Sequence, residues 1–547
     1  MADGPLIVQS DRTVLLEVAH PDAEAARHDL AVFAELERAP EHIHTYRITR
    51  LGLWNARAAG HTADDMLATL DRYTRFPVPP SVATDLRETV ERYGRLTIER
   101  GEEGELLLRA TDRYVLAEVS RNKRIQNLLI GHPAPDTFVI DAWARGQIKQ
   151  ELLKIGWPAE DLAGYTPGTP HEIALDETSW SLRPYQQQAV DTFSHDGSGV
   201  VVLPCGAGKT LVGAGAMAQT KTTTLILVTN TVSARQWRDE LLKRTTLTTE
   251  EIGEYSGQVK EIKPVTIATY QILTSKRKGV YAHLDVLDAL DWGLIVYDEV
   301  HLLPAPVFKL TADLQARRRL GLTATLVRED GREGDVFSLI GPKRYDVPWK
   351  EIEQQGYISP AACYEVRVDL PPSERLEYAA AADDERYRLA ATAPAKIDAV
   401  REIVERHADE QILVIGQYLD QLQELSDALE APQITGATPV DEREQLFQAF
   451  REGSLRVLVV SKVANFSIDL PEASVAIQVS GSFGSRQEEA QRLGRLLRPK
   501  QSDHTASFYT LIARDTVDQE FAQNRQRFLA EQGYSYTILD ADGLVAA

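Results

Sequence analysis

Cysteine is scarce in this chain, which has only two such residues among 547, Cys205 and Cys363. Two distant cysteines exclude a disulfide-stapled scaffold and a cysteine-rich zinc site, and they fit a reducing cytosol. The chain also lacks any apolar run of the ~18–20 residues that a membrane span needs. Its first residues carry no basic-then-apolar signal. These absences predict a cytoplasmic protein without a membrane partner, associated with the nucleoid if the source is bacterial.

Positive charge is in deficit, because 81 acidic residues outnumber 60 basic ones and give a net charge of −21. This total argues weakly against a nucleic-acid partner. A protein can nevertheless hold a strand in a local groove of donors, whatever the charge of its whole surface. The net charge therefore does not decide between partners.

A strand, a small-residue loop and a helix are predicted in succession from Val200 to beyond Thr210. The glycines let backbone N–H groups turn inward on a phosphate at the positive end of the following helix. Lys209 is expected to reach the β- and γ-phosphates, and the Thr210 hydroxyl to bind Mg²⁺. Leu203 stands where the usual pattern begins with glycine, and the alternative is an ordinary strand-to-helix turn. The loop residues expected to bind nucleotide are Pro204, Cys205, Gly206, Ala207 and Gly208.

Two carboxylates follow the apolar stretch Leu294–Tyr297, in the sequence Asp298-Glu299-Val300-His301, a DEVH box. The carboxyl end of a parallel strand is where open sheets bind ligand. Asp298 is expected to hold Mg²⁺, and Glu299 to orient and deprotonate the attacking water. His301 lies too close to act at the same atom, so we assign it to signalling across the cleft.

Arg492, Arg495 and Arg498 recur every three residues and share one face if the segment is a helix. Guanidinium groups placed on a γ-phosphate from a second domain would stabilise transition-state charge, as arginine fingers do. The alternative is a solvated basic face. A hydrolysis site split between two domains converts nucleotide state into domain closure, which is how a motor works.

Strands and helices alternate in two series, one from Leu182 and one from about residue 395. Each series predicts an α/β domain with a parallel sheet covered by helices on both faces. The stretch between them, Asp369–Ala395, reads as a helical protrusion or an exposed spacer.

The first part of the chain has an α+β pattern. We expect helical spacing over Pro21–Arg38, a helix capped at Thr62, another capped at Ser81, and then two strands in a winged-helix-like arrangement. Further on, Tyr114–Val119 alternates as a strand, and the basic cluster Arg121-Asn122-Lys123-Arg124 follows it. That cluster fits a phosphate contact or a solvated face equally well.

These motifs in this order resemble superfamily 2 helicases. Leu182-Arg183-Pro184-Tyr185-Gln186 matches the adenine-sensing stretch before the phosphate loop, which assigns Arg183 and Gln186 to the nucleotide. Thr229 and Thr269 lie in segments that match those gripping the nucleic-acid backbone, and Leu322-Thr323-Ala324-Thr325 matches the coupling motif. The triplet Arg328, Glu329 and Asp330, directly after it, points to the XPB family, where it is implicated in prying the duplex apart.

The resemblance implies two tandem RecA-like motor domains preceded by α+β accessory domains, with ATP and Mg²⁺ as cofactors. It adds Gln491 to Arg495 and Arg498 in the catalytic set, and it retains Asp469 although the residues before it depart from the family pattern. The implied segments are an N-terminal accessory domain at 1–103, a damage-recognition-like domain at 104–176, motor domain 1 at 177–347, a linker with a short thumb-like insertion at 348–394, and motor domain 2 at 395–547.

The function that the resemblance implies is ATP-dependent, 3′-to-5′ unwinding of DNA in repair. The alternatives are a duplex-DNA translocase and an ATP-driven conformational switch in a repair or transcription assembly. The expected partners are DNA at single-strand/duplex junctions and repair or transcription proteins, with a nuclease as one candidate. An RNA helicase fits the Arg-Glu-Asp triplet less well.

Overall fold

The structure is a computed structural model that describes residues 4–39, 42–204, 206–277, 280–281, 283–287, 289–304, 307, 314–315, 317–326, 332–357, 360–461, 473–481, 505–532, 534 and 536–541. Nine of the residues singled out above lie outside these ranges: Cys205, Arg328, Glu329, Asp330, Asp469, Gln491, Arg492, Arg495 and Arg498.

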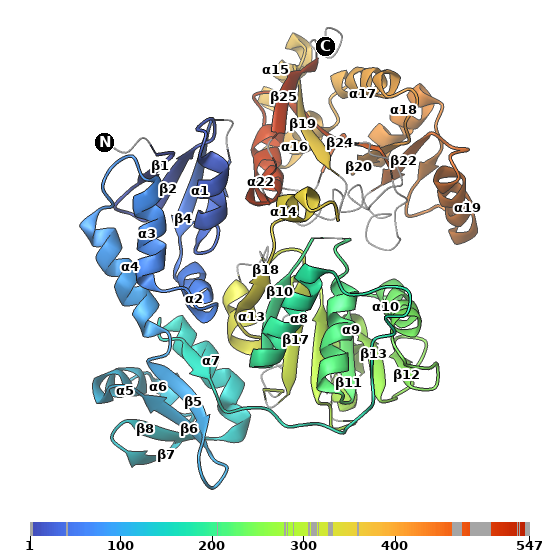
Figure 1. The fold of residues 1–547 in the computed structure, drawn as a ribbon. Helices are drawn as coiled ribbons and strands as arrows, with labels where there is room; N and C mark the ends of the chain where they lie inside the picture. The colour runs from blue at the N-terminus through green and yellow to red at the C-terminus, as the bar shows by residue number, and fades with distance from the viewer. Residues whose placement is uncertain are drawn as a thin grey trace.

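The N-terminal domain is a four-stranded antiparallel sheet in the order β1-β2-β4-β3, packed with helices (Figure 1). Thr62 caps α3 as predicted, since its side chain accepts from the Asp65 N–H. The helix over Pro21–Arg38 is wrong beyond residue 30, where the chain turns and returns as the edge strand β3. Ser81 is not a cap, because Pro79 takes that position. The elements are β1 (Leu6–Val8), β2 (Thr13–Glu17), α1 (Ala23–Leu30), β3 (Ala34–Arg38), β4 (Ile43–Ile48), α2 (Arg50–Ala58), α3 (Ala63–Tyr73) and α4 (Pro80–Arg92).

A histidine on β4 makes this domain sensitive to acid. His44 is buried, and burial together with the nearby charge of Arg27 lowers the pKa of the His44 imidazole to about 4. Between pH 6.5 and 4, the His44 imidazole is therefore protonated in the unfolded chain but neutral in the folded domain. We expect the free energy of unfolding of the N-terminal domain to fall by up to about 3 kcal/mol across that window.

Hydrogen exchange of the β4 amides, followed against pH in the full chain, measures this effect. His44→Leu should flatten the pH dependence, whereas His42→Leu, at an exposed position on the same segment, should leave it as in the parent. An identical pH dependence in both variants would contradict the assignment.

The second accessory domain has a five-stranded sheet in the order β7-β8-β6-β5-β9. Its strands β5 and β6 pair with each other in this sheet, so they form no wing on the preceding helices, and the boundary expected after residue 103 falls between them. The strand expected at Tyr114–Val119 is wrong: these residues belong to helix α5, which Asp112 caps and which buries Val115, Leu116 and Val119 against the sheet. The elements are β5 (Leu96–Arg100), β6 (Leu106–Ala110), α5 (Arg113–Ser120), α6 (Lys123–Gln126), β7 (Leu129–Ala134), β8 (Thr137–Ile140), η1 (Ala142–Ala144), α7 (Arg145–Lys154) and β9 (Ala159–Asp161).

The first motor domain is a seven-stranded sheet in the order β12-β13-β11-β16-β17-β10-β18, with all of its pairs parallel. Strands β10, β11 and β13 are buried along their whole length, as a sheet covered on both faces requires. The elements are α8 (Pro184–Asp196), β10 (Ser198–Val202), α9 (Lys209–Thr220), β11 (Thr224–Val228), α10 (Thr231–Arg244), β12 (Ile252–Tyr255), β13 (Val265–Thr269), α11 (Tyr270–Thr274), β14 (Lys276–Arg277), β15 (Val280–Tyr281), η2 (Leu284–Leu287), β16 (Leu294–Asp298), η3 (Val300–Leu302), β17 (Arg318–Thr323), α13 (Glu333–Leu339) and β18 (Lys343–Asp346).

The second motor domain repeats this architecture with the order β21-β22-β20-β23-β24-β19-β25, again with parallel pairs. The stretch Asp369–Ala395, expected as a helical protrusion or an exposed spacer, forms α15 and α16. Because β19 before it pairs in the second sheet, the stretch lies inside the second motor domain, and the boundary expected at residue 395 is too late. The elements are α14 (Trp349–Gln354), β19 (Ala361–Val368), α15 (Pro372–Ala380), α16 (Asp383–Ala391), α17 (Ala395–Arg406), β20 (Ile412–Gly416), α18 (Leu419–Leu429), β21 (Gln433–Ile434), α19 (Val440–Arg451), β22 (Val457–Ser461), β23 (Val475–Gln478), β24 (Ala506–Ala513), α22 (Val517–Glu531) and β25 (Tyr536–Asp540).

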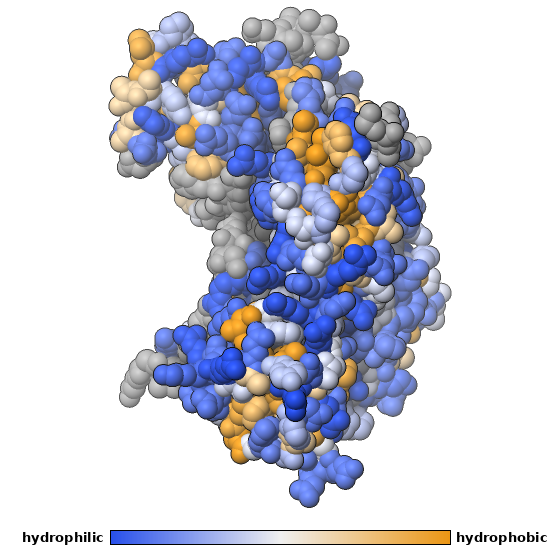
Figure 2. Space-filling view, turned by 90° about the vertical axis from the view of Figure 1, so that its left-hand side faces the viewer, coloured by the Kyte–Doolittle hydropathy of each residue, from blue (hydrophilic) through white to orange (hydrophobic). Residues whose placement is uncertain are grey.

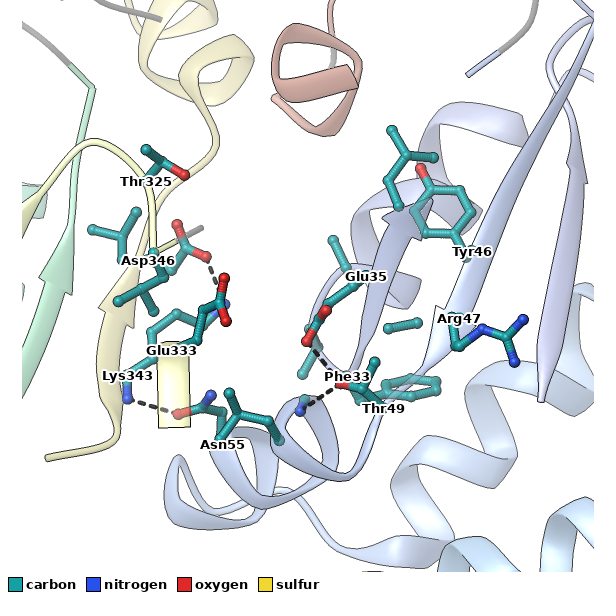
Figure 3. A pocket seen from close by; sticks show the side chains of 18 of the residues that line it. Phe33, Glu35, Tyr46, Arg47, Thr49, Asn55, Thr325, Glu333, Lys343 and Asp346 are labelled. Atoms are coloured by element: carbon teal, nitrogen blue, oxygen red, sulfur yellow. Dashed lines mark hydrogen bonds and ion pairs between the residues drawn. The ribbon is translucent and has the colours of Figure 1, made fainter. Parts of the chain in front are cut away.

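The N-terminal domain touches both motor domains. Asn55 Oδ1 accepts from the Lys343 N–H at 2.9 Å on the first, and Arg527 of α22 on the second donates to the Glu37 carbonyl. Ala530 of α22 packs into the N-terminal core. A cavity of about 540 Å³ lies at this junction, where Glu35 and Asn55 face Glu333 and other residues of the first motor domain (Figure 3).

Candidate functional site

The loop after β10 is shaped to receive an anion. Gly206 and Gly208 have φ angles of +80° and +79°, a left-handed conformation that suits glycine. A Cβ on Gly208 would lie 2.4 Å from Gln186 Nε2, so a larger residue would displace the Gln186 amide. Helix α9 begins at Lys209 and points its N-terminal N–H groups toward the loop. Backbone donors and the helix dipole thus converge on one place, which is the geometry of a phosphate cradle.

Helix α8 supports the loop from behind. Gln186 Nε2 donates to the Ala207 carbonyl at 2.8 Å, and the Tyr185 hydroxyl donates to the same carbonyl at 2.7 Å. The Gln186 side-chain oxygen accepts from the Arg183 N–H, so both ends of the amide are bonded to protein. Arg183 stacks over the Tyr357 ring, which follows α14. These bonds make Gln186 a support of the cradle.

Two carboxylates meet the loop at the same sheet edge. Strand β16 ends at Asp298, two positions from β10 in the sheet, and parallel strands bring their carboxyl ends together. Glu299 Oε1 lies 3.2 Å from Lys209 Nζ. Glu299 also has a φ angle of +48°, a left-handed conformation that costs a non-glycine residue about 1–3 kcal/mol. Strain of this kind gathers at functional sites, where it aims a side chain.

Asp298 is held from two sides. Trp237 Nε1 donates to Asp298 Oδ2 at 2.9 Å, and the Tyr270 hydroxyl donates to the Asp298 carbonyl at 2.7 Å. Burial and the charge of Glu299 raise the pKa of the Asp298 carboxyl, and the Trp237 bond opposes that rise. Asp298 is half-buried, and a carboxylate of raised pKa in such a place is stabilised by a cation. The donor set therefore fits Mg²⁺, which binds a few carboxylates together with hydroxyl and phosphate oxygens.

Glu299 stays charged despite its burial. Burial alone would raise the pKa of its carboxyl, but the ammonium of Lys209 and the ring of His301 outweigh burial and lower it. An ionised carboxylate beside the cradle is suited to hold a water and take its proton.

His301 connects Glu299 to strand β17. Its Nδ1 lies 3.4 Å from Glu299 Oε2 and 2.6 Å from the Thr323 hydroxyl. The Thr323 hydroxyl donates its single hydrogen bond to the Thr325 carbonyl at 2.6 Å. His301 Nδ1 is therefore the donor in the His301–Thr323 bond. A continuous path therefore runs from Glu299 through His301 and Thr323 to Thr325.

Thr229 and Thr269 lie at the carboxyl ends of the adjacent strands β11 and β13, whose residues Val228 and Thr269 are partners in the ladder. The Thr269 hydroxyl caps α11 by accepting from the Ile272 N–H, and that of Thr229 lies 3.3 Å from Ser233 Oγ. Both residues lie at the same carboxyl edge of the sheet as the cradle. Their strands, β11 and β13, are separated from β10 by β16 and β17.

The structure thus brings together Lys209, Asp298, Glu299, His301 and Thr323. It adds Trp237 and Tyr270, which the sequence reasoning did not assign to Asp298. No motif marks Trp237: in the sequence it is one aromatic residue on the inward face of a helix.

Comparison with known proteins places the chain in a family. The family model described as the ERCC3/RAD25/XPB C-terminal helicase matches residues 352–544, that of the type III restriction enzyme res subunit matches 179–328, and that of a helicase conserved C-terminal domain matches 6–133. A DNA 3′-5′ helicase XPB of Kineococcus radiotolerans is 67% identical, with 100% of this chain and 98% of the relative covered. The chain belongs to the XPB family.

Other XPB relatives span a wide range of identity. The DNA 3′-5′ helicase XPB of Mycobacterium tuberculosis is 63% identical over 100% of this chain and 99% of that protein. The XPB/SSL2 helicase/translocase subunit of general transcription and DNA repair factor IIH from Saccharomyces cerevisiae is 31% identical. The match covers 98% of this chain and 72% of that protein. The XPB family membership confirms the expected pair of RecA-like domains. The described part of the chain has no helix that could cross a membrane.

Proposed function

We propose that this chain is an ATP-dependent 3′-to-5′ DNA helicase that acts in DNA repair. The observation that carries the proposal is the full-length similarity, at 63% and 67% identity, to two proteins named DNA 3′-5′ helicase XPB. The cradle, Lys209 and the paired carboxylates supply the chemistry that such an activity requires. We expect it to work in the cytoplasm, on the nucleoid if the source is bacterial.

The ATP site is proposed to use residues of both motor domains. Bound Mg²⁺-ATP supplies the reactive γ-phosphoryl group and part of the counter-charge. Lys209 would contact the β- and γ-phosphates, and Thr210 and Asp298 would hold the metal. Glu299 orients the attacking water and takes its proton. The second motor domain contributes Gln491, Arg495 and Arg498, and the guanidinium groups of the two arginines stabilise charge in the transition state.

Coupling to DNA is proposed to follow the path from Glu299 to Thr325. Because Glu299, His301 and Thr323 are linked, a change at the cradle alters the hydrogen bonding of the Thr325 segment. Thr229 and Thr269 are assigned to the DNA backbone at the same sheet edge, and Asp469 to the corresponding part of the second motor domain.

The second accessory domain is proposed to contact DNA, as its damage-recognition-like place in the chain suggests. Hydrophobic side chains gather beside hydrophilic ones over this domain, in the lower part of Figure 2. Tyr114 and Trp143 are 68% and 56% exposed, and Arg113 stacks on Tyr114. In the basic cluster at 121–124, Arg121 and Asn122 form the turn between α5 and α6, and Lys123 and Arg124 begin α6. Exposed aromatic rings with adjacent cations suit stacking on bases and contact with phosphates.

For the Arg-Glu-Asp triplet we predict that a double substitution affects strand separation but not ATP hydrolysis. Arg328→Ala with Asp330→Ala should leave DNA-stimulated ATP hydrolysis within about two-fold of the parent and reduce strand separation about ten-fold or more. The triplet follows the coupling segment but holds none of the groups that bind nucleotide. Parallel measurement of ATP hydrolysis and strand displacement checks this, and an equal loss of both would show that the triplet supports the fold.

The alternatives differ in their response to nucleic acid. ATP hydrolysis should be measured with single-stranded DNA, blunt duplex DNA and RNA, alongside displacement of a strand. Stimulation by single-stranded DNA together with displacement supports the helicase. Stimulation by blunt duplex without displacement favours the duplex translocase, and no response to any nucleic acid favours the switch.

A further inference from the structure

A group of buried side chains in motor domain 2 grips the backbone at the carboxyl end of β23. Three consecutive residues, Val479, Ser480 and Gly481, are each bonded to a different element. Strand β23 lies in the middle of the sheet, and the carboxyl edge is where an open parallel sheet binds its ligand. The chain that leaves Gly481 leads to Gln491, Arg495 and Arg498.

Val479 is held by a charged pair. Lys396 Nζ, on α17, donates to the Val479 carbonyl at 3.0 Å and to Asp518 Oδ2 at 2.7 Å. The side chains of Lys396 and Asp518 are 1% and 0% exposed. Asp518 Oδ2 also accepts from the Ala513 N–H at the end of β24. The pair therefore joins the ends of β23 and β24, the two strands that flank the arginine-bearing segment in the sequence.

Ser480 is held by a glutamine. Its hydroxyl accepts from the Gln417 N–H at 2.8 Å and donates to Gln421 Oε1 at 2.9 Å. Gln421 Nε2 in turn donates to the Ala391 carbonyl at 2.9 Å, at the last residue of α16. This bond connects the end of β23 to the short helical insertion formed by α15 and α16, between β19 and α17.

Gly481 is held by the same insertion. The hydroxyl of Tyr387, on α16, donates to the Gly481 carbonyl. Tyr387 is 2% exposed, and its ring meets Phe521 of α22 edge-on at 4.9 Å. Helix α16 is thus packed into the domain, bonded directly to Gly481 and linked to Ser480 through Gln421 of α18.

From this geometry we infer that Tyr387, Gln421 and Lys396 are positioning residues for ATP hydrolysis: they fix the backbone from which the arginine-bearing segment leaves. The inference rests on the proposed function, since it gives those arginines their role. A group that stabilises a transition state acts only from the right place, and small displacements cost rate without costing substrate affinity. The short insertion then serves the hydrolysis site through α16.

The test removes one hydroxyl and leaves the fold. Tyr387→Phe deletes the bond to Gly481 and keeps the ring. Tyr509→Phe is the matched control, because Tyr509 is buried in the same domain and its hydroxyl bonds to His407 instead. Steady-state ATP hydrolysis by the full chain with single-stranded DNA gives kcat and the KM for ATP, and thermal unfolding of each variant checks folding.

Tyr387→Phe should lower kcat about three- to ten-fold, the effect of one hydrogen bond lost from an aligned site, with the KM for ATP within two-fold of the parent. Gln421→Met, which deletes the bonds to Ser480 and Ala391, should lower kcat in the same way. Tyr509→Phe should match the parent in both constants. A normal kcat in Tyr387→Phe, an equal loss in Tyr509→Phe, or a raised KM at normal kcat would each overturn the inference.

Different results would refute the proposed function and the positioning role of Tyr387. A parent chain that shows no DNA-stimulated ATP hydrolysis above Lys209→Ala would refute the proposed function. A parent that hydrolyses ATP while Tyr387→Phe behaves like Tyr509→Phe would refute only the positioning role.

Discussion

Lys209→Ala is expected to reduce DNA-stimulated ATP hydrolysis by at least about 1000-fold, because the ammonium is the cation that the loop delivers to the phosphates. Lys209 is the first residue of α9, and its Nζ already lies 3.2 Å from Glu299 Oε1. The substitution removes the counter-charge to the phosphates and also leaves Glu299 with one partner fewer. The loss should therefore appear in kcat and in ATP affinity together.

The matched control is Lys221→Ala at the other end of the same helix. Lys221 is exposed and pairs with Glu172 at 3.4 Å on the surface. Its removal should leave hydrolysis within about two-fold of the parent, since exposed ion pairs are worth little. Near-normal turnover in Lys209→Ala would contradict the assignment of this loop.

Glu299→Gln is the second large effect that we expect. The amide keeps the shape of the side chain but cannot take a proton from water, so kcat should fall about 100- to 1000-fold. ATP should still bind, because Lys209, Thr210 and the cradle are intact. Equilibrium titration with a fluorescent ATP analogue, together with single-turnover hydrolysis, separates the two steps.

Glu261→Gln provides the control for this variant, since Glu261 is an exposed carboxylate of the same domain. It should match the parent in both assays. If Glu299→Gln lost binding in proportion to hydrolysis, Glu299 would be a ligand of the nucleotide or its metal rather than the base.

Much of the motor fold can be predicted from the sequence, because its signals are strong. Runs such as Leu225–Val228 and Leu294–Tyr297 are continuously apolar, as strands covered on both faces must be, and both lie in the parallel sheet. The accessory domains are harder. Tyr114–Val119 alternates over a few residues, but Val115 and Val119 are one helical turn apart, and only the sheet beneath them decides for a helix.

The candidate site, too, could be predicted only in part from the sequence. Lys209, Asp298 and Glu299 could be predicted to meet. Asp298 ends one parallel strand and Glu299 follows it, Lys209 ends the loop after another strand, and those strand ends share one edge. The left-handed backbone of Glu299 and the grip of Trp237 on Asp298 could not be predicted, because both depend on neighbours distant in the sequence. For Gln186, the motif predicts a contact with the nucleotide, which stays a prediction. Its amide bonds to the Ala207 carbonyl and the Arg183 N–H could not be predicted from the motif.

The most direct test of the proposed activity is strand displacement on tailed duplexes. The parent chain and Glu299→Gln are given ATP and Mg²⁺ with duplexes that carry a single-stranded tail at either the 3′ or the 5′ end of the tracking strand. We predict ATP-dependent displacement by the parent on the 3′-tailed duplex alone, and none by Glu299→Gln. Displacement on the 5′-tailed duplex, or on neither duplex while ATP is hydrolysed, would contradict a 3′-to-5′ helicase.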